Sequence, residues 1–172
     1  VVVDTLPASM GEGLLIYYAA QKRLAGASLQ EVAAFVEDNR NQLCHWFTVD
    51  DLNHLKRGGR ISAAAALFGS MLGIKPVLHV DDAGHLIPMA KVRGRRASLD
   101  ALILHMEQTV IKPEEQVIFI SHGDCLKDAE YVADQIRKRW KVRDIIINYI
   151  GPVIGAHSGP GTVALFFFGS HK

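Results

Sequence analysis

The residue types best suited to binding chemistry lie near the C-terminus, in the stretch GAHSGPGT at residues 155–162. His157 can donate a hydrogen bond from its ring, and Ser158 and Thr162 offer hydroxyl groups. The glycines let a backbone approach a bound group closely, and the proline restricts the turn. These groups suit the carboxylate or phosphate of a ligand. A tight turn without a ligand explains the same composition, so the residues leave both interpretations open.

Spacing disfavours two kinds of catalytic site. Gly155 precedes Ser158 by three residues, whereas the nucleophile elbow G-x-S-x-G requires two. No acidic residue follows Ser158 to complete a triad. The eight histidines include no H-x-x-x-H pair with a nearby carboxylate, so we predict no metal site. A hydrolase or phosphotransferase that uses His157 and arginines on an anionic small molecule stays the alternative function.

Basic residues gather in two stretches, DLNHLKRGGRIS at residues 51–62 and AKVRGRRAS at residues 90–98. The seven are Lys56, Arg57, Arg60, Lys91, Arg93, Arg95 and Arg96. If the stretches meet in space, they form a basic surface for a phosphate or an acidic partner protein. Solvated loops fit the same pattern. The formal net charge is only +1 and aromatic residues are not interleaved, so we predict no nucleic-acid partner.

The stretch SHGD at residues 121–124 follows a buried apolar run and precedes a helical pattern. In open α/β sheets, ligands bind at this edge. His122 could contact a ligand there, although a packing role is favoured, and Asp124 is expected to be the N-cap of the helix. Cys125 in the first helical turn is a weak signal for a thiol of lowered pKa.

Hydrophobic periodicity and capping signals predict the elements that position these residues. The expected strands are residues 1–5, 43–49, 75–81, 85–93, 115–124, 143–151 and 162–169. The expected helices are residues 9–27, 28–42, 51–59, 62–73, 97–110 and 125–140. The expected N-terminal caps of the first four helices are Ser9 with Glu12, Ser28 with Glu31, Asp50, and Ser62.

The order of these elements predicts an α/β fold with a mixed sheet. Residues 115–150 read as a β-α-β unit, which implies two parallel strands. Asp82, Ala83 and Gly84 signal an antiparallel hairpin, and Pro88 confines the second hairpin strand to an edge or a bulge. A composition of 49% hydrophobic residues can build the core.

Overall composition also indicates the cellular compartment and the domain organisation. Two distant cysteines indicate a reduced, cytoplasmic protein, and no apolar run approaches the roughly 18 residues of a membrane span. A compositional break at residues 48–59 suggests a domain boundary. The chain opens at Val1 with an apolar stretch that would need pairing partners, so we expect that the sequence is a fragment.

Taken together, the sequence resembles the DegV family over nearly all of its 172 residues. The patterns L-x-R-G-G-R-I-S and G-x-H-x-G-P-G-T are the most specific. The matching stretches, in family order, are ASMGEGLL, DLNHLKRGGRIS, GIKPVLHVDDAGHL, KVRGRRAS, SHGD and IGPVIGAHSGPGTVAL.

The resemblance implies a carrier rather than an enzyme, with no catalytic residue and no cofactor. Family members are two-domain α/β proteins that bind one long-chain fatty acid in a buried tunnel. Where a fatty acid kinase exists, they present the carboxylate to it for acyl-phosphate formation. His157 then corresponds to the carboxylate contact, with Ser158 beside it, and Arg57, Arg60 and Arg93 match a kinase-facing basic surface.

The resemblance also divides the chain. Residues 1–47 correspond to the remnant of an N-terminal α/β domain, a strand and two helices, and residues 48–172 to the C-terminal DegV-type domain. About a hundred further N-terminal residues, with other carboxylate contacts, are expected in the family. Ala65, Phe68 and Met71 are expected to line the acyl chain, although core packing alone explains such residues. A protein-interaction module that uses only the basic patch is a third interpretation.

Overall fold

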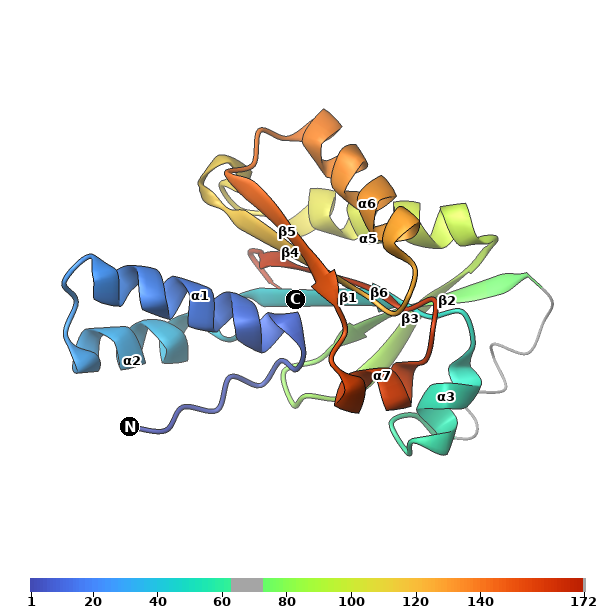
Figure 1. Cartoon of the computed structure of the whole chain (residues 1–172), viewed down its shortest axis with the longest axis horizontal. Helices are drawn as coiled ribbons and strands as arrows, with labels where there is room; N and C mark the ends of the chain where they lie inside the picture. The colour runs from blue at the N-terminus through green and yellow to red at the C-terminus, as the bar shows by residue number, and fades with distance from the viewer. Residues whose placement is uncertain (63–72, 172) are drawn as a thin grey trace.

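The computed structural model describes residues 1–62 and 73–171, and these form a mixed sheet of six strands in the order β3-β2-β1-β6-β4-β5 (Figure 1). The strands are β1 (Leu43–Thr48), β2 (Ile74–Val80), β3 (Leu86–Arg93), β4 (Val117–His122), β5 (Asp144–Tyr149) and β6 (Val163–Phe168). The helices are α1 (Met10–Leu24), α2 (Leu29–Asn39), α3 (Leu52–Arg57), α5 (Arg95–Thr109), α6 (Leu126–Arg139), α7 (Pro152–Ser158) and the 3-10 helix η1 (Pro113–Glu115). The predicted α/β fold class is therefore confirmed.

The sheet combines both predicted types of pairing. Strands β4 and β5 are parallel and are joined through α6, which confirms the β-α-β unit. The hairpin β2–β3 and the other described pairs are antiparallel. Pro88 lies on the edge strand β3 opposite Leu78, next to a register shift between Val77 and Leu78. Proline is tolerated at an edge or a bulge because it has no backbone N–H to donate.

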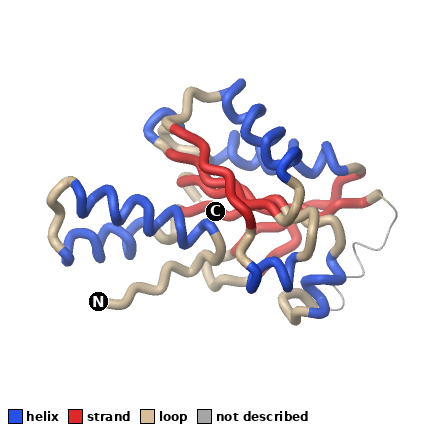
Figure 2. The backbone as a smooth tube through the Cα atoms, viewed as in Figure 1, coloured by secondary structure: helices blue, strands red, loops and turns tan. Residues whose placement is uncertain are grey.

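Alternating side chains give the sheet two apolar faces. The backbone trace shows helices on both sides of the sheet (Figure 2). On one face, α5 and α6 pack over Trp46, Leu165 and Phe167. On the other face, Phe47 and Phe166 join a cluster that includes buried residues of α1 and α3. Each fully buried large apolar side chain stabilises the fold by about 1.5–3 kcal/mol, so both layers hold the sheet rigid.

Residues 1–5 do not form the predicted strand. Val1 and Val2 are exposed, and the segment is held by local bonds instead. The amide of Leu6 donates to the Asp4 carboxylate, and Arg40 donates to the Asp4 carbonyl. An apolar run without a neighbouring strand edge has no ladder to join, which explains the wrong prediction.

One of the predicted helix caps is confirmed, and two others are wrong. The box of Ser28 and Glu31 is confirmed, since each backbone amide donates to the other's side chain. The predicted box at Ser9 is wrong, because Ser9 has a φ of 60° and its side chain caps nothing. Asp51, not Asp50, caps α3 by accepting the Asn53 amide at 2.8 Å.

The helix predicted at residues 62–73 and the expected acyl-chain residues Ala65, Phe68 and Met71 lie outside the described residues. The predicted domain boundary after residue 47 falls inside β1, which pairs with β2 and β6. The division into two domains stays a prediction. No helix in residues 1–62 or 73–171 is both long and apolar enough to cross a membrane.

Candidate functional site

A cavity of about 700 Å³ lies on the face of the sheet that carries α1, α3 and α7. Most of its wall is apolar, including Phe47, Leu55, Ile61, Leu86, Ile154 and Ala164. Its polar groups include His45, Arg60, Ser121, His157, Ser158 and Thr162. An apolar cavity of this size with a few polar groups is typical of a binding site for a small molecule with one polar end.

Small side chains on the sheet leave room for the cavity. Ala164 of β6 lies between Ser121 of β4 and Phe47 of β1 in the strand register. The adjacent row on the same face holds the bulky rings of Phe119 and Phe166. The sheet surface is therefore hollowed at Ser121 and Ala164, which have small side chains and both line the cavity.

The stretch that opened the sequence analysis is not simply a turn. Residues 152–158 form α7, with Pro152 in its first turn, and Gly159, with a φ of 79°, ends it. Proline at the start and glycine just past the end are a recognised helix signature that could have revealed α7. His157 and Ser158 consequently lie in the last turn of a helix, and the turn itself begins at Gly159.

Three glycines let the segment around α3 interlock with α7 and the turn that follows it. A Cβ atom at Gly58 would lie 2.2 Å from Nδ1 of His157. A Cβ at Gly159 would lie 2.5 Å from the His54 ring, and one at Gly161 would lie 2.4 Å from the Asp50 carboxylate. No side chain fits at such distances, so the backbone of each segment directly contacts a side chain of the other.

At Gly58, close packing and not backbone conformation accounts for the glycine. Its φ is −74°, which any residue can adopt, whereas Gly59 has a φ of 69° and open space around its Cα. The sequence analysis interpreted both glycines as the end of a helix. The structure shows that only contact with His157 requires the glycine at position 58.

The hydroxyl groups in the cavity differ in their partners. Thr162 donates to the carbonyls of Ser158 and Gly159, at 3.1 and 2.8 Å. The hydroxyls of Ser121 and Ser158 are buried and have no hydrogen-bond partner in the part of the chain that the structure describes. Buried polar groups normally have a hydrogen-bond partner, so these two hydroxyls are available to bind a polar group that enters the cavity.

The SHGD stretch joins the site through its backbone. The Gly123 amide donates to the Thr162 carbonyl at 2.8 Å, and the Gly161 amide donates to the Gly123 carbonyl at 2.7 Å. His122 is buried against Tyr149, and its Nδ1 accepts the Cys125 amide at 3.3 Å. His122 is thus a packing residue, as favoured from the sequence.

The expected roles of Asp124 and Cys125 are corrected. Asp124 has a φ of 54° and does not cap α6, because Cys125 occupies the cap position. Burial raises the pKa of the Cys125 thiol, and the nearby Arg95 guanidinium only partly opposes this effect. Cys125 is therefore not an activated thiol.

The predicted basic residues occupy separate elements. Arg57 in α3 lies 3.1 Å from Nδ1 of His54, and Arg60 donates to the Gly58 carbonyl at 2.8 Å. Both are exposed, and Arg60 also lines the cavity. Arg93 is exposed at the end of β3.

Arg95 and Arg96, which follow Arg93 in the second basic stretch, already contact other side chains. Arg95 contacts Asp128 at 2.8 Å and Asp50 at 3.8 Å, and Lys75 contacts Asp50 at 2.8 Å. Arg96 lies over the ring of Tyr131. Across residues 1–62 and 73–171, no group of three or more His, Cys, Asp or Glu side chains is arranged to hold a metal ion.

The sequence matches a known protein family and several bacterial relatives. Residues 1–170 match a family model described as "Uncharacterised protein, DegV family". A DegV domain-containing protein of Clostridium perfringens is 54% identical over 171 residues, which are 99% of this chain and 59% of the relative. The chain thus spans about three fifths of the length of this relative.

Solved structures share the fold. A DegV family protein of Thermus thermophilus, described by its fatty acid binding, is 29% identical with a TM-score of 0.88 over 98% of this chain and 60% of its own. The fatty acid kinase (Fak) B3 protein of Streptococcus pneumoniae, loaded with linoleic acid, has a TM-score of 0.88 over 98% of this chain and 59% of its own. At 20% identity, the second likeness shows the fold alone.

Proposed function

The chain belongs to the DegV family, and on this premise we propose that it binds one long-chain fatty acid in the cavity between the sheet and α7. The observation that carries the proposal is an apolar cavity of about 700 Å³ with unsatisfied hydroxyls and a histidine in its wall. Burial of an acyl chain there stabilises the complex by about 0.8 kcal/mol per methylene group.

The carboxylate of the ligand is proposed to contact His157 and Ser158. Both residues line the cavity, and the Ser158 hydroxyl lacks another partner among the described residues. The contact of His157 with Gly58 fixes the position of the imidazole. A neutral imidazole and a hydroxyl can each donate one hydrogen bond to a carboxylate, which accepts several.

The site supports binding better than hydrolysis. Ser158 forms no hydrogen bond with a base in the described residues, so the nucleophile–base pair of a serine hydrolase is missing. Solved relatives such as the DegV protein of Thermus thermophilus are described by fatty acid binding rather than as enzymes.

We further propose that a fatty acid kinase receives the bound carboxylate and that Arg57, Arg60 and Arg93 form the surface for this partner. The exposure of the three arginines supports this role, as does the name of the Streptococcus pneumoniae structure that shares the fold. The sequence holds two cysteines, Cys44 and Cys125, and no disulfide bond joins them. This supports a reducing compartment, so we propose a cytoplasmic location.

Substitution of His157 tests the head-group assignment. In the full-length protein, His157→Ala is expected to weaken binding of palmitate about tenfold or more by calorimetry, because one hydrogen bond to a charged group is lost. The matched control is His171→Ala, since His171 is exposed and does not line the cavity. Equal affinities of the two variants would contradict the assignment of His157.

A further inference from the structure

We propose that Ser121 is a further ligand residue, which donates its hydroxyl to the carboxylate of the bound fatty acid beside Ser158. This inference rests on the proposed function, and it extends the head-group site from α7 to strand β4. Within SHGD, residue types alone favour His122 and Asp124 as functional candidates, and the sequence predicts no role for Ser121.

Burial and bonding single out Ser121. Its exposed fraction is 0%, and its Oγ has no hydrogen-bond partner in the described ranges 1–62 and 73–171. A hydroxyl can donate one hydrogen bond and accept others, so this burial is unfavourable unless something else supplies a partner. Ser121 lines the cavity, which is where that partner would lie.

The strand pattern confirms which way Ser121 faces. Ile118 and Ile120 of β4 belong to the core under α5 and α6, whereas Phe119 belongs to the cluster on the cavity face. Because side chains alternate along a strand, Ser121 faces the same side as Phe119. A small apolar residue at position 121 would pack against this face equally well. Core packing therefore does not account for a hydroxyl group at this position.

The neighbours of Ser121 leave its hydroxyl open to a ligand. The cross-strand partner in β6 is Ala164, whose methyl group is small and which also lines the cavity. The third hydroxyl nearby, Thr162, is already bonded to two backbone carbonyls. Ser121 and Ser158 are therefore two buried cavity hydroxyls without a partner in the described residues, and a carboxylate can accept more than one hydrogen bond.

This arrangement predicts discrimination between head groups. A carboxylate accepts several hydrogen bonds and carries charge, whereas the methyl ester of the same acid is neutral and a weaker acceptor. Ser121 is therefore expected to favour free fatty acids over their esters.

The test compares a hydroxyl that has no protein partner with one that has two. In the full-length protein, Ser121→Ala is expected to weaken palmitate binding about tenfold while the urea midpoint of the ligand-free protein is unchanged or higher. Thr162→Val is the matched control, and it should lower the urea midpoint because it removes the one hydroxyl hydrogen that two backbone carbonyls share. Affinity for methyl palmitate should change little in Ser121→Ala.

The outcomes separate this inference from the proposed function. If the wild-type protein binds palmitate and Ser121→Ala binds it equally well, Ser121 is no ligand, whatever the fate of the wider proposal. If the wild-type protein binds no fatty acid, the proposed function itself fails. A lowered urea midpoint with unchanged affinity would assign Ser121 a structural role only and would overturn the inference.

A second readout covers the case in which Ser121→Ala folds poorly. Palmitate labelled with carbon-13 at the carboxyl group reports the pKa of the bound head group by NMR. Ser121→Cys, with its weaker donor, should raise that pKa relative to the wild-type complex, because hydrogen bonds to a carboxylate favour the charged form. An identical titration in the two complexes would overturn the inference.

Discussion

Gly58 shows how strongly the site depends on a single missing methyl group. Its Cα lies so close to His157 that a Cβ atom would be 2.2 Å from Nδ1 of the ring. Sequence patterns identify a glycine pair at this point but not its partner, because His157 follows Gly58 by 99 residues. Steric requirements set by distant segments are not encoded in local composition.

Gly58→Ala is expected to displace the His157 ring and to weaken palmitate binding at least tenfold. The matched control is Gly155→Ala in α7, where a Cβ would meet no atom within 4 Å and alanine favours the helix. Isothermal calorimetry on both variants measures the affinities. Wild-type affinity in Gly58→Ala would show that the position of His157 does not matter for binding.

At the scale of elements, local signals predicted most strands and helices, and tertiary contacts decided the exceptions. The hairpin, the β-α-β unit and the capping box at Ser28 follow from local chemistry and are present. The strand at residues 1–5 fails for want of a partner strand. Helix α7 was not predicted, because the glycine-rich stretch at residues 155–162 is typical of a turn.

Helix α3 contains Arg57 and ends at Gly58, which packs against His157. The N-cap at Asp51 therefore stabilises a helix that borders the site. The Asn53 amide, donating to Asp51, lowers the pKa of this carboxyl below its ordinary value. A depressed pKa in the folded state gives stability that is present above the unfolded pKa. That stability is lost as the pH falls through the folded pKa.

Asp51→Ala is therefore expected to lower the free energy of unfolding by about 1 kcal/mol at pH 7, the usual value of an N-cap. Asp51→Asn should retain most of this stability, because asparagine caps equally well without titrating. The difference between wild type and Asp51→Ala should shrink as the pH falls below about 3.8. Urea unfolding at several pH values measures it, and a constant difference would argue against a charged cap.

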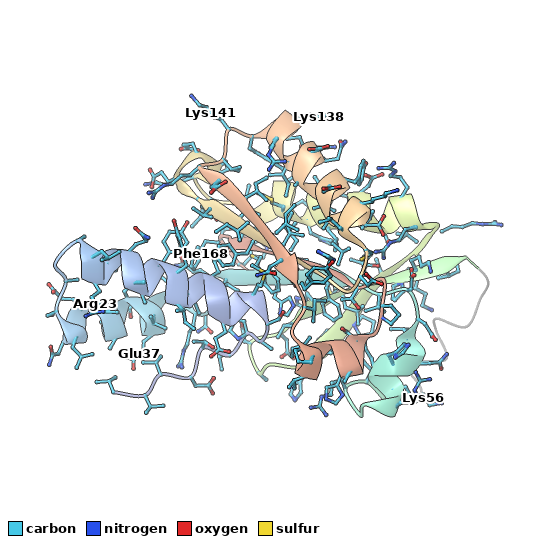
Figure 3. The ribbon with its side chains drawn as sticks, viewed as in Figure 1. Arg23, Glu37, Lys56, Lys138, Lys141 and Phe168 are labelled. Carbon is cyan, nitrogen blue, oxygen red and sulfur yellow. The ribbon has the colours of Figure 1, made fainter. Side chains whose placement is uncertain are left out.

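At the scale of the whole molecule, α5 and α6 cover one face of the sheet, and the cavity opens on the other beside α3 and α7. Figure 3 shows Lys56 on α3 and Arg23 on α1 at opposite ends of the molecule. The family and the fold class could be predicted from sequence, and His157, predicted as the carboxylate contact, lies in the cavity wall. The cavity shape could not be predicted, because it depends on the register of β4, β6 and β1.

The basic surface is expected to serve the kinase rather than the ligand. Arg57→Ala should leave palmitate affinity unchanged and slow acyl-phosphate formation by a purified fatty acid kinase several-fold, most clearly at low salt. Arg57 is a cleaner test than Arg60, which lines the cavity. Arg23→Ala at the far end of the molecule is the control, and equal kinase rates for both variants would refute the assignment.

The central claim is that the cavity holds a fatty acid. The most direct measurement is mass spectrometry of lipids extracted from the full-length protein purified from cells, with the His157→Ala variant beside it. We predict about one long-chain fatty acid per wild-type molecule and clearly less in the variant. Wild-type protein that carries no acyl chain, and that takes up none when palmitate is added, would contradict the account.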